Sequence, residues 1–328
     1  MKTHFLFVLN PKSFWHQWKQ EDVITKIHLY FNEINDKNYA IHISRFPRDV
    51  AGFIPAYAKE LGDDTRLRVY AIGGDGILFD CLNGIMGLQN AELGAIPYGR
   101  TNIFLQGFGR NSKTAFRSIE RQYSAPAVAM DVIHCGSSYS LSNCVIGLEA
   151  KTVRITDIMR ENLNNGNAFT RWLNRNLYTL IYFIAGIAAC RNTEFNNYRY
   201  TVDFDDKQIS DTLMGISIFN SPYYGGRLHP VRKAMPNDGI LDTLTHRRRG
   251  GVPAYYLIPL YVSGRYALFP KSLHYRQCRK IKIKSDKPAV MSMDGIVFYE
   301  SDLEIELLPG AVRFIDPSAL GYLGAGND

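Results

Sequence analysis

A glycine-rich segment after an apolar run, residues 69–72, has the composition of a phosphate-binding turn. The segment reads Gly73-Gly74-Asp75-Gly76, and a helix-like stretch, 77–86, follows it. Glycines permit φ > 0 and remove the side chains that would block a ligand. The N-terminus of a helix adds a partial positive charge and N–H donors. The pattern favours contact with phosphate, although a tight strand-to-helix turn needs glycine even where nothing binds.

Further polar segments lie at the ends of predicted strands. They are Asn10-Pro11-Lys12-Ser13, residues 97–104, residues 220–226, residues 238–242 and Asp294-Gly295. Each segment has an ordinary interpretation, because Asn, Asp, Gly and Pro are the usual residues of turns. The order and the spacing of the set carry more information than any one member.

The first part of the chain alternates strand and helix patterns. We predict strands at 4–9, 40–44, 67–72 and 93–96, and helices at 24–34, 49–61 and 77–86. Asp49 is the predicted N-cap of the second helix. Alternating strands and helices indicate a parallel sheet with helices on both faces. Ligands of such sheets bind beyond the carboxyl ends of the strands, where the glycine-rich turns lie.

The pattern changes near residue 126. Later runs alternate apolar with polar residues, which is typical of antiparallel strands with one solvated face. We predict such strands at 127–134, 138–146, 198–204, 208–210, 280–284 and 303–307, with helical inserts at about 150–164 and 170–190. The predicted fold is therefore an α/β domain, 1–126, and a β-rich domain, 127–316. A tail, 317–328, either frays or packs back on the first domain.

Composition narrows the class of protein. Hydrophobic residues make up 46% of the 328 residues and charged residues 21%, as in globular proteins. The longest apolar stretch, 177–190, is shorter than the ~20 residues that a membrane-spanning helix needs. Five cysteines without CxxC spacing favour a reducing compartment, and the eight histidines lack ligand spacing. The N-terminus lacks the features of a signal peptide, so we expect a cytoplasmic protein.

The net charge of +7 leaves three interpretations open. Basic residues cluster at 247–249 and at 276–287. A solvated basic face is the favoured interpretation. Peripheral contact with an anionic membrane is the functional alternative. Nucleic acid is not expected as a partner, because no motif for its recognition is present.

Taken together and in order, the motifs resemble those of the diacylglycerol kinase catalytic-domain family. The resemblance runs from Asn10 to Asp294 and rests on NPxS, GGDG, PxGxxNxF, a Tyr-Gly-Gly segment, DGxLD and a late DG. The resemblance implies a Rossmann-like first domain, as in NAD kinases and phosphofructokinases, and an antiparallel β-sandwich as the second. It also implies ATP-dependent, Mg²⁺-dependent phosphoryl transfer to the hydroxyl of a lipid.

By the same resemblance, individual residues acquire expected roles. The residues expected to line the nucleotide are Asn10, Ser13, Gly73, Gly74, Asp75, Gly76, Gly99, Arg100 and Asn102. Asp238 and the backbone oxygen of Ile240 match a segment that holds a structural Mg²⁺ in bacterial relatives. Asp294, with Asp75, is expected to be part of the catalytic network. Phosphoryl transfer needs this kind of charge neutralisation and positioning.

The residues that depart from the family pattern lie in the motifs in which the catalytic and nucleotide-binding side chains are expected. Phe14 replaces a glycine, Ile77 a threonine, Phe79 a polar residue, Arg100 a threonine, Ile103 an aspartate and Ile296 the glutamate that would be the base. An isoleucine cannot accept a proton. Two classes of function therefore stay open. One is an unusual active lipid kinase, with Glu300 or Asp80 as a replacement base. The other is a non-catalytic relative that binds nucleotide, lipid or a partner. A soluble kinase of the NAD kinase type is a weaker third alternative.

Two further features bear on partners. Residues 177–184 are apolar on nearly every face, as in a helix that is buried or that lines an acyl-chain groove. The alternating strand at 279–285 offers an edge through which a homodimer could form.

Overall fold

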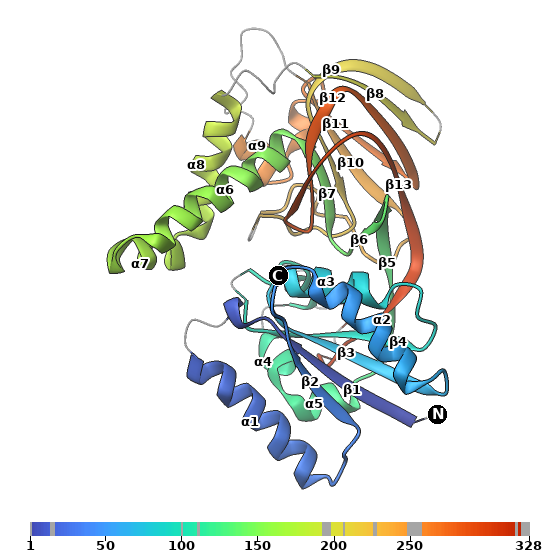
Figure 1. The fold of residues 1–328 in the computed structure, drawn as a ribbon. Helices are drawn as coiled ribbons and strands as arrows, with labels where there is room; N and C mark the ends of the chain where they lie inside the picture. The colour runs from blue at the N-terminus through green and yellow to red at the C-terminus, as the bar shows by residue number, and fades with distance from the viewer. Residues whose placement is uncertain are drawn as a thin grey trace. The chain divides into compact units, whose positions relative to one another are not determined.

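The computed structural model describes residues 2–13, 17–99, 101–109, 112–191, 198–205, 207–225, 228–247, 258–318 and 321–322 (Figure 1). The chain forms two compact units. Unit 1 is Met1–Val132 together with Pro309–Asp328, and unit 2 is Ile133–Leu308. These limits differ from the predicted 1–126 and 127–316, because two long strands run across the boundary and each contributes residues to both units.

Unit 1 is an α/β unit with a parallel sheet. Its elements are β1 (Lys2–Leu9), η1 (Pro11–Ser13), α1 (Gln17–Glu33), β2 (Tyr39–Ile43), α2 (Asp49–Leu61), β3 (Thr65–Gly73), α3 (Asp75–Ile85), β4 (Ala91–Pro97), η2 (Phe104–Phe108), α4 (Ser112–Arg117) and α5 (Ile119–Ser124). The strands lie in the order β4-β3-β1-β2 and all pair in parallel. Helices α1 and α5 cover one face of the sheet, and α2 and α3 cover the other (Figure 1). The predicted alternation is confirmed.

Alternate side chains of β1 form the hydrophobic core between the sheet and α1. Phe5, Phe7 and Leu9 belong to one buried cluster with Ile27 and Phe31 of α1. Successive side chains of a strand point to opposite faces, so the residues between them are directed to the α2–α3 side. A nearly continuous apolar strand is expected where both faces of a parallel sheet are covered.

The predicted bounds of the second helix, 49–61, are confirmed by α2, but its predicted N-cap, Asp49, is wrong. The N-cap is Arg48, with φ 66° and no side-chain hydrogen bond, and Asp49 is the first helical residue. The carboxylate of Asp49 instead accepts from the hydroxyl of Ser44 at 2.8 Å and from the N–H of Arg45 at 2.7 Å. The Asp49 side chain therefore stabilises the preceding loop instead of capping the helix, because two donors of that loop lie within hydrogen-bond distance of its carboxylate.

The end of the chain returns to unit 1. Strand β13 (Ile296–Ile315) brings Phe314 beside Leu93 of β4 in parallel. Tyr322 then packs on Phe104 and Phe108, with ring centroids 5.1 and 5.0 Å apart. A Cβ at Gly107 would lie 2.2 Å from the Tyr322 ring, so only glycine leaves room for it.

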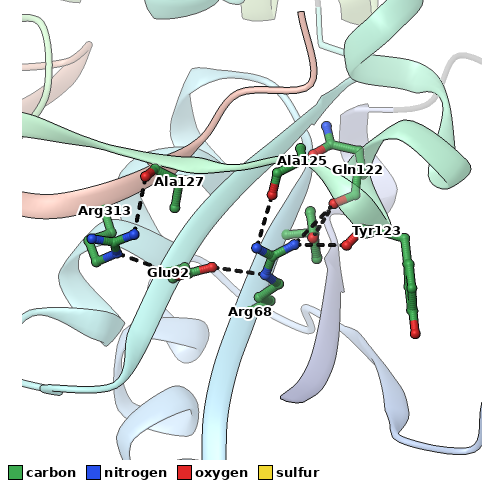
Figure 2. Close-up of polar contacts among 8 residues, drawn as sticks. Arg68, Glu92, Gln122, Tyr123, Ala125, Ala127 and Arg313 are labelled. Carbon is green, nitrogen blue, oxygen red and sulfur yellow. Dashed lines mark hydrogen bonds and ion pairs between the residues drawn. The ribbon is translucent and has the colours of Figure 1, made fainter. Parts of the chain in front are cut away.

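An arginine–glutamate network joins the strands that leave and enter unit 1 (Figure 2). Arg68 of β3 donates to Glu92 of β4 at 2.8 Å and to the carbonyls of Tyr123 and Ala125 at 2.9 Å. Arg313 donates to Glu92 at 3.5 Å and to the carbonyl of Ala127 at 3.2 Å. The network therefore fixes the chain where it leaves for unit 2 and where it returns.

Unit 2 is rich in antiparallel strands. Its strands are the end of β5 (Ala127–Cys135), β6 (Ser138–Ser140), β7 (Asn143–Gly147), β8 (Tyr198–Phe204), β9 (Gln208–Phe219), β10 (Leu241–Arg247), β11 (Leu273–Cys278), β12 (Lys280–Met293) and the first part of β13. The order is β11-β10-β9-β7-β12-β13, and β8 pairs with both β9 and β12. The predicted β-rich domain with helical inserts is confirmed.

The helical inserts of unit 2 are α6 (Leu148–Asn165), α7 (Ala168–Asn176) and α8 (Tyr178–Arg191), and α9 (Ile258–Val262) and η5 (Tyr266–Leu268) follow later. Helix α8 is not buried on every side. Ile181, Tyr182 and Ala185 are buried, whereas Leu180 and Ile184 are 49% and 45% exposed. Within the described residues, none of the helices combines the length and the apolar character that crossing a membrane requires.

The expected dimerisation edge at 279–285 is absent. Residues 281–285 of β12 pair with β8 on one side, and residues 280–284 pair with β13 on the other. On the solvated face, Lys282 lies opposite Glu304 and Lys284 opposite Asp302. The basic run is therefore an ion-pair ladder inside a sheet, where paired strands leave no backbone groups to offer to a second chain.

We predict that Arg68→Met lowers the free energy of unfolding by about 3 kcal/mol, because it leaves the buried Glu92 carboxylate without its main partner. Arg313→Met is the matched control, since its side chain is 59% exposed and its removal is expected to cost less than ~1 kcal/mol. Urea unfolding of the two variants measures the difference, and equal losses would contradict the assignment.

Candidate functional site

Three loops of unit 1 meet at the carboxyl ends of neighbouring parallel strands. They follow β1, β3 and β4, and they contain most of the residues expected at the nucleotide. The N–H of Asn10 donates to the carbonyl of Ile72 at 3.2 Å, and the N–H of Ser13 donates to the carbonyl of Asn10 at 3.0 Å. The first loop is thereby attached to the end of β3, as expected at this edge of a parallel sheet.

The second and third loops touch through their backbones. The N–H of Gly99 donates to the carbonyl of Gly73 at 2.6 Å. A Cβ at Gly99 would lie 2.1 Å from the Cα of Gly74, and a Cβ at Gly74 would lie 3.2 Å from the Cα of Gly99. A Cβ at Gly73 would lie 2.7 Å from the Ser13 hydroxyl oxygen. These three glycines are required by packing between loops, whether or not a ligand binds.

Gly76 is different from the other three glycines. It is exposed in the first turn of α3, and a Cβ there would have no atom within 4 Å. The backbone therefore faces open space at the N-terminus of an eleven-residue helix. The first N–H groups of a helix have no partner inside it and carry the positive end of the helix dipole. An anion can approach the backbone closely at this position.

Asp75 holds the third loop in place. Its carboxylate accepts from the hydroxyl of Thr101 and from the N–H of Ile103, both at 2.6 Å. Burial raises the pKa of the Asp75 carboxyl above its ordinary value, and these two hydrogen bonds oppose that rise. The interactions place Asp75 in the architecture of the loop, a role that the sequence did not indicate.

Asn102 completes the third loop. Its backbone has φ 46°, a left-handed conformation that asparagine tolerates better than most residues. Its side-chain amide donates to the carbonyl of Gly99 at 2.8 Å. Asn102 therefore shapes the wall in which the resemblance places it. Arg100, the neighbouring predicted site residue, and Phe14 lie outside the described residues.

The apolar replacements in α3 belong to the core. Ile77 is 2% exposed and Phe79 is 3% exposed. Ile77 also contacts the Gly73 position, since a Cβ there would lie 2.8 Å from its Cγ2. These side chains therefore pack into the core behind the first turn of α3 instead of projecting into open space.

Asp294, in unit 2, organises a second turn. Its carboxylate accepts from the N–H groups of Leu141 at 2.8 Å and of Ser142 and Asn143 at 3.0 Å, while its own backbone has φ 46°. The side chain of Asn220 donates to the carbonyl of Leu141 at 2.8 Å. Two of the predicted motifs are thus brought together around the loop before β7.

The two carboxylates suggested as replacement bases, Glu300 and Asp80, lie on different elements of the structure. Ile296 begins β13 opposite Met293, and Glu300 is exposed four residues further along the same strand, opposite Ala289. Asp80, in unit 1, accepts from the N–H of Arg48 at 3.2 Å. Among the described contacts within unit 2, none joins Glu300 to Asp294 or its turn.

Asp238 and Ile240 form a separate turn before β10. The N–H of Ile240 donates to the Asp238 carboxylate at 3.0 Å, and Gly239 has φ 73°. Asp238 is exposed. Across the described residues, no cluster of three or more His, Cys, Asp or Glu side chains has metal-ligating geometry. Mg²⁺ often binds through one or two carboxylates and several waters, so Asp238 fits the role of one ligand and not of a complete site.

Sequence reasoning missed a buried polar pair in unit 2. Glu149 follows β7 at the start of α6, and its carboxylate lies 3.1 Å from Nε2 of His246 on β10. Burial raises the pKa of Glu149 to about 8 and lowers the pKa of His246 to about 3. The residues are 97 positions apart and share no motif, so the only sequence signal was a charged residue directly after an apolar strand.

Comparison with known proteins gives two domain matches. Residues 4–135 match the family model of the diacylglycerol kinase catalytic domain. Residues 164–316 match the YegS C-terminal NAD kinase beta sandwich-like domain. The two matches correspond to the α/β and the β-rich parts of the chain, and they agree with the fold described above.

Individual proteins that are similar to this chain support the same family. A "Putative lipid kinase" of Staphylococcus aureus (strain MRSA252) is 24% identical over 286 residues, which cover 85% of this chain and 87% of that protein. A crystal structure of a "putative diacylglycerol kinase" from Bacillus anthracis str. Sterne superposes with a TM-score of 0.71 at 18% identity, covering 95% and 97% of the two chains. A second structure, of "a diacylglycerol kinases" from the same organism, gives a TM-score of 0.65 at 16% identity, covering 95% of this chain and 96% of that chain.

The Glu149–His246 pair predicts a specific dependence of stability on pH. Between pH 4.5 and 8, the folded state holds a proton on Glu149 that the unfolded state lacks, so stability falls as pH rises. Between pH 3 and 6.5, folded His246 lacks a proton that the unfolded state binds, so stability rises with pH. The two slopes cancel from pH 4.5 to 6.5, and the Glu149 slope remains alone up to pH 8.

We therefore expect Glu149→Gln to remove a decline of up to ~1.4 kcal/mol per pH unit between pH 6.5 and 8. Urea unfolding of wild type and variant at both ends of this window measures the effect. Glu161→Gln, at an exposed position of the same helix, is the control and should leave the slope unchanged. Parallel curves for wild type and Glu149→Gln would contradict the assignment.

Proposed function

The chain belongs to the diacylglycerol kinase catalytic-domain family, and we propose that it binds ATP in unit 1 and transfers the γ-phosphoryl group to a lipid hydroxyl. The observation that carries the proposal is Gly76. It lies at the N-terminus of α3, beside two packed glycine turns, and a Cβ added there would have no atom of another segment within 4 Å. A glycine that packing does not require, at a helix N-terminus, favours close approach of phosphate.

Neighbouring groups supply further contacts in this proposal. The backbone of Gly74 and Gly76 would donate to phosphate oxygens, and the Ser13 hydroxyl, next to Gly73, would add a side-chain donor. Asn102 would hold the opposite wall through its bond to Gly99. Positioning and electrostatic stabilisation provide most of the catalysis in phosphoryl transfer, so a rigid donor set of this kind is suited to it.

Membership of a kinase family implies a divalent metal as well as ATP. Asp238 and the carbonyl of Ile240 would contribute oxygen ligands, the donor type that Mg²⁺ prefers. A bound Mg²⁺ supplies neutralisation of phosphate charge. The chain's own contribution would be to orient the ligand oxygens. The hydrogen bond from the N–H of Ile240 to the Asp238 carboxylate would orient that carboxylate.

A second candidate function, nucleotide or lipid binding without transfer, is favoured by a specific observation. The Asp75 and Asp294 carboxylates each hold backbone N–H groups, and Ile296 stands where the family places a glutamate. Loss of a general base typically lowers the rate 10²- to 10⁴-fold. A chain that binds ATP but transfers no phosphoryl group would belong to this class.

The partner surface that we propose for unit 2 is an anionic bilayer. Exposed apolar side chains gather on α7 and α8, where Phe169, Trp172 and Leu180 are 63%, 53% and 49% exposed. The rings of Phe169 and Trp172 stack with centroids 6.1 Å apart, and exposed Arg171 lies between them in sequence. An amphipathic helix with aromatic and basic residues suits the interface of a membrane.

The basic clusters support this proposal less than the helices do. Arg247 is paired with Asp211 at 2.8 Å, and the lysines of β12 face acidic residues of β13. Arg248 and Arg249 lie outside the described residues. Ion pairs of this kind reduce the positive potential that a surface offers to anionic lipid.

Gly76→Leu tests the nucleotide site. We expect at least a tenfold loss of Mg²⁺–ATP affinity with unchanged folding, because the Cβ of the added side chain lies in open space and the side chain covers the exposed helix N-terminus. Gly52→Leu is the matched control, since Gly52 is also exposed on a helix of unit 1 and a Cβ added there would have no atom within 4 Å. Calorimetry on both variants and wild type gives the affinities.

Each result decides between the two candidate functions. Binding by wild type and Gly52→Leu but not by Gly76→Leu supports the nucleotide site. Transfer of label from γ-labelled ATP to lipid then supports the kinase, and binding without transfer supports the non-catalytic relative. If wild type fails to bind at millimolar ATP, the proposal is abandoned.

Phe169→Ser combined with Trp172→Ser tests the membrane surface. We expect the double variant to bind vesicles that contain anionic lipid at least tenfold more weakly, because two large apolar side chains no longer enter the interface. Phe46→Ser is the control, since this residue of unit 1 is also 63% exposed and lies outside the patch. Co-sedimentation measures the binding. Equal binding by wild type and double variant would rule out this surface.

A further inference from the structure

Tyr322, near the end of the chain, fills a buried site against η2 of unit 1. Tyr322 is 6% exposed, and its ring packs on Phe104 and Phe108, with centroids 5.1 and 5.0 Å apart. A Cβ at Gly107 would lie 2.2 Å from the Tyr322 ring, so η2 has glycine at the position that the ring covers. Phe314 of β13 contacts the same two phenylalanines, with centroids 5.0 and 5.7 Å apart. Two segments from the end of the chain therefore pack on η2.

The turn that leads to Tyr322 is itself fixed by hydrogen bonds. Asp316, directly after β13, is buried, and its carboxylate accepts from the N–H of Gly321 at 3.1 Å and from the N–H of Ser318 at 2.9 Å. The N–H of Asp316 donates to the carbonyl of Pro126 at 2.9 Å. A buried carboxylate that accepts several backbone hydrogen bonds holds a turn in one conformation. The chain therefore directs Tyr322 to its site through specific bonds.

The η2 segment is also bonded to the third loop of the candidate nucleotide site. The side-chain amide of Gln106 donates to the carbonyl of Thr101, and its backbone N–H donates to the carbonyl of Ile103, both at 3.1 Å. Thr101 and Ile103 are the residues that donate to the Asp75 carboxylate at 2.6 Å. Asp75 is the first residue of α3. A connected series of contacts thus leads from Tyr322, through η2 and Asp75, to the N-terminus of α3.

We propose that Tyr322 is a positioning residue of the nucleotide site. Its ring holds η2 in place, and η2 holds residues 101–103 and the start of α3 in the arrangement that binds phosphate. Without the ring, the loop occupies this arrangement for only a fraction of the time, and the apparent affinity for nucleotide falls by that fraction. This role rests on the ATP binding proposed above, and it makes the end of the chain a determinant of nucleotide affinity.

Thermodynamic linkage makes the effect reciprocal. If the Tyr322 contact raises the affinity for nucleotide, bound nucleotide must stabilise the Tyr322 contact by the same factor. A side chain that only adds to the stability of unit 1 has no such coupling. Its loss lowers the free energy of unfolding but leaves the affinity of the folded protein unchanged. Measurements of affinity therefore separate the two roles.

Two variants of Tyr322 test the proposal by calorimetry with Mg²⁺–ATP on the full chain. Tyr322→Ala should weaken binding about tenfold, because η2 loses the ring that packs on it. Tyr322→Phe keeps the ring and should bind within about twofold of wild type. Recovery of affinity by phenylalanine assigns the effect to ring packing and not to the hydroxyl.

Tyr123→Ala is the matched control. Tyr123 also packs on two phenylalanines of unit 1, Phe5 and Phe31, with ring centroids 4.7 and 5.8 Å apart. Its hydroxyl donates at 3.2 Å to Asp36, which precedes β2 and so lies at the opposite edge of the parallel sheet from the glycine turns. This variant should lower the stability of unit 1 and leave the affinity for ATP unchanged.

Gly107→Ala supplies a second, independent perturbation of the same contact. The added methyl would overlap the Tyr322 ring, so we expect ATP to bind more weakly by about fivefold or more. In the Tyr322→Ala background the ring is absent, and the same methyl should have almost no further effect. Coupling of this kind in a double-mutant cycle shows that the two positions act through one contact.

Hydrogen exchange on the wild-type protein tests the reciprocal effect without any variant. The N–H of Gly321 is bonded to Asp316 and reports on the turn that holds Tyr322. Saturating Mg²⁺–ATP should slow its exchange by about fivefold or more, because nucleotide favours the arrangement in which η2 and Tyr322 are packed. The N–H of Asn38, which is bonded to the Asp36 carboxylate at the opposite edge of the sheet, should exchange at an unchanged rate.

Each outcome supports or overturns the role of Tyr322. Weaker ATP binding by Tyr322→Ala, with recovery in Tyr322→Phe and no change in Tyr123→Ala, supports it. Equal affinities of wild type and Tyr322→Ala, an equal loss in Tyr123→Ala, or additive effects with Gly107→Ala would overturn it and leave the proposed ATP binding intact. Absence of ATP binding by wild type would overturn both proposals. If Tyr322→Ala does not fold, the exchange of Gly321 decides, since an unchanged rate on addition of ATP would contradict the coupling.

Discussion

The backbone contact between Gly74 and Gly99 is the constraint on which the candidate nucleotide site depends. It brings the turn after β3 against the turn after β4, and the carbonyl of Gly73 accepts from the N–H groups of both Tyr98 and Gly99. A side chain at Gly99 would force the loops apart, because its Cβ would lie 2.1 Å from the Cα of Gly74. The position of α3, and therefore the direction of its N-terminal N–H groups, follows from this contact.

The acidic residues of the two predicted catalytic positions serve the same purpose in separate units. Asp75 accepts from the Thr101 hydroxyl and from the N–H of Ile103, and Asp294 accepts from the N–H groups of residues 141–143. A carboxylate that accepts several hydrogen bonds is fixed in orientation. Both aspartates therefore have a structural role in their loops that does not depend on catalysis.

The sequence was sufficient for the fold because the relevant signals are local. Alternation in β1 and β12 and the helical repeat of α1 each depend on a few neighbouring residues, and most predicted elements were found. The strand predicted at 138–146 is two strands, β6 and β7, and the helix predicted at 170–190 is two helices, α7 and α8. Contacts between distant segments were not predictable in this way. The bonds of Asp75 to Thr101, the burial of Glu149 beside His246 and the pairing of β8 with β12 all depend on tertiary structure. The prediction of Asp49 as the N-cap, where the structure has Arg48, is wrong for the same reason. The Asp49 carboxylate accepts hydrogen bonds from Ser44 and Arg45 instead.

Strand β13 has a consequence for how the chain acquires its structure. Residues 309–315 complete the sheet of unit 1, and Tyr322 covers Phe104 and Phe108, yet both arrive after all of unit 2 has been synthesised. Contacts of such large sequence separation slow folding, because the intervening loop must close first. During translation, β4 of unit 1 therefore lacks its partner, residues 309–315 of β13, until unit 2 has been synthesised. The strand that completes the sheet of unit 1 is therefore available only after the whole of unit 2 has been synthesised.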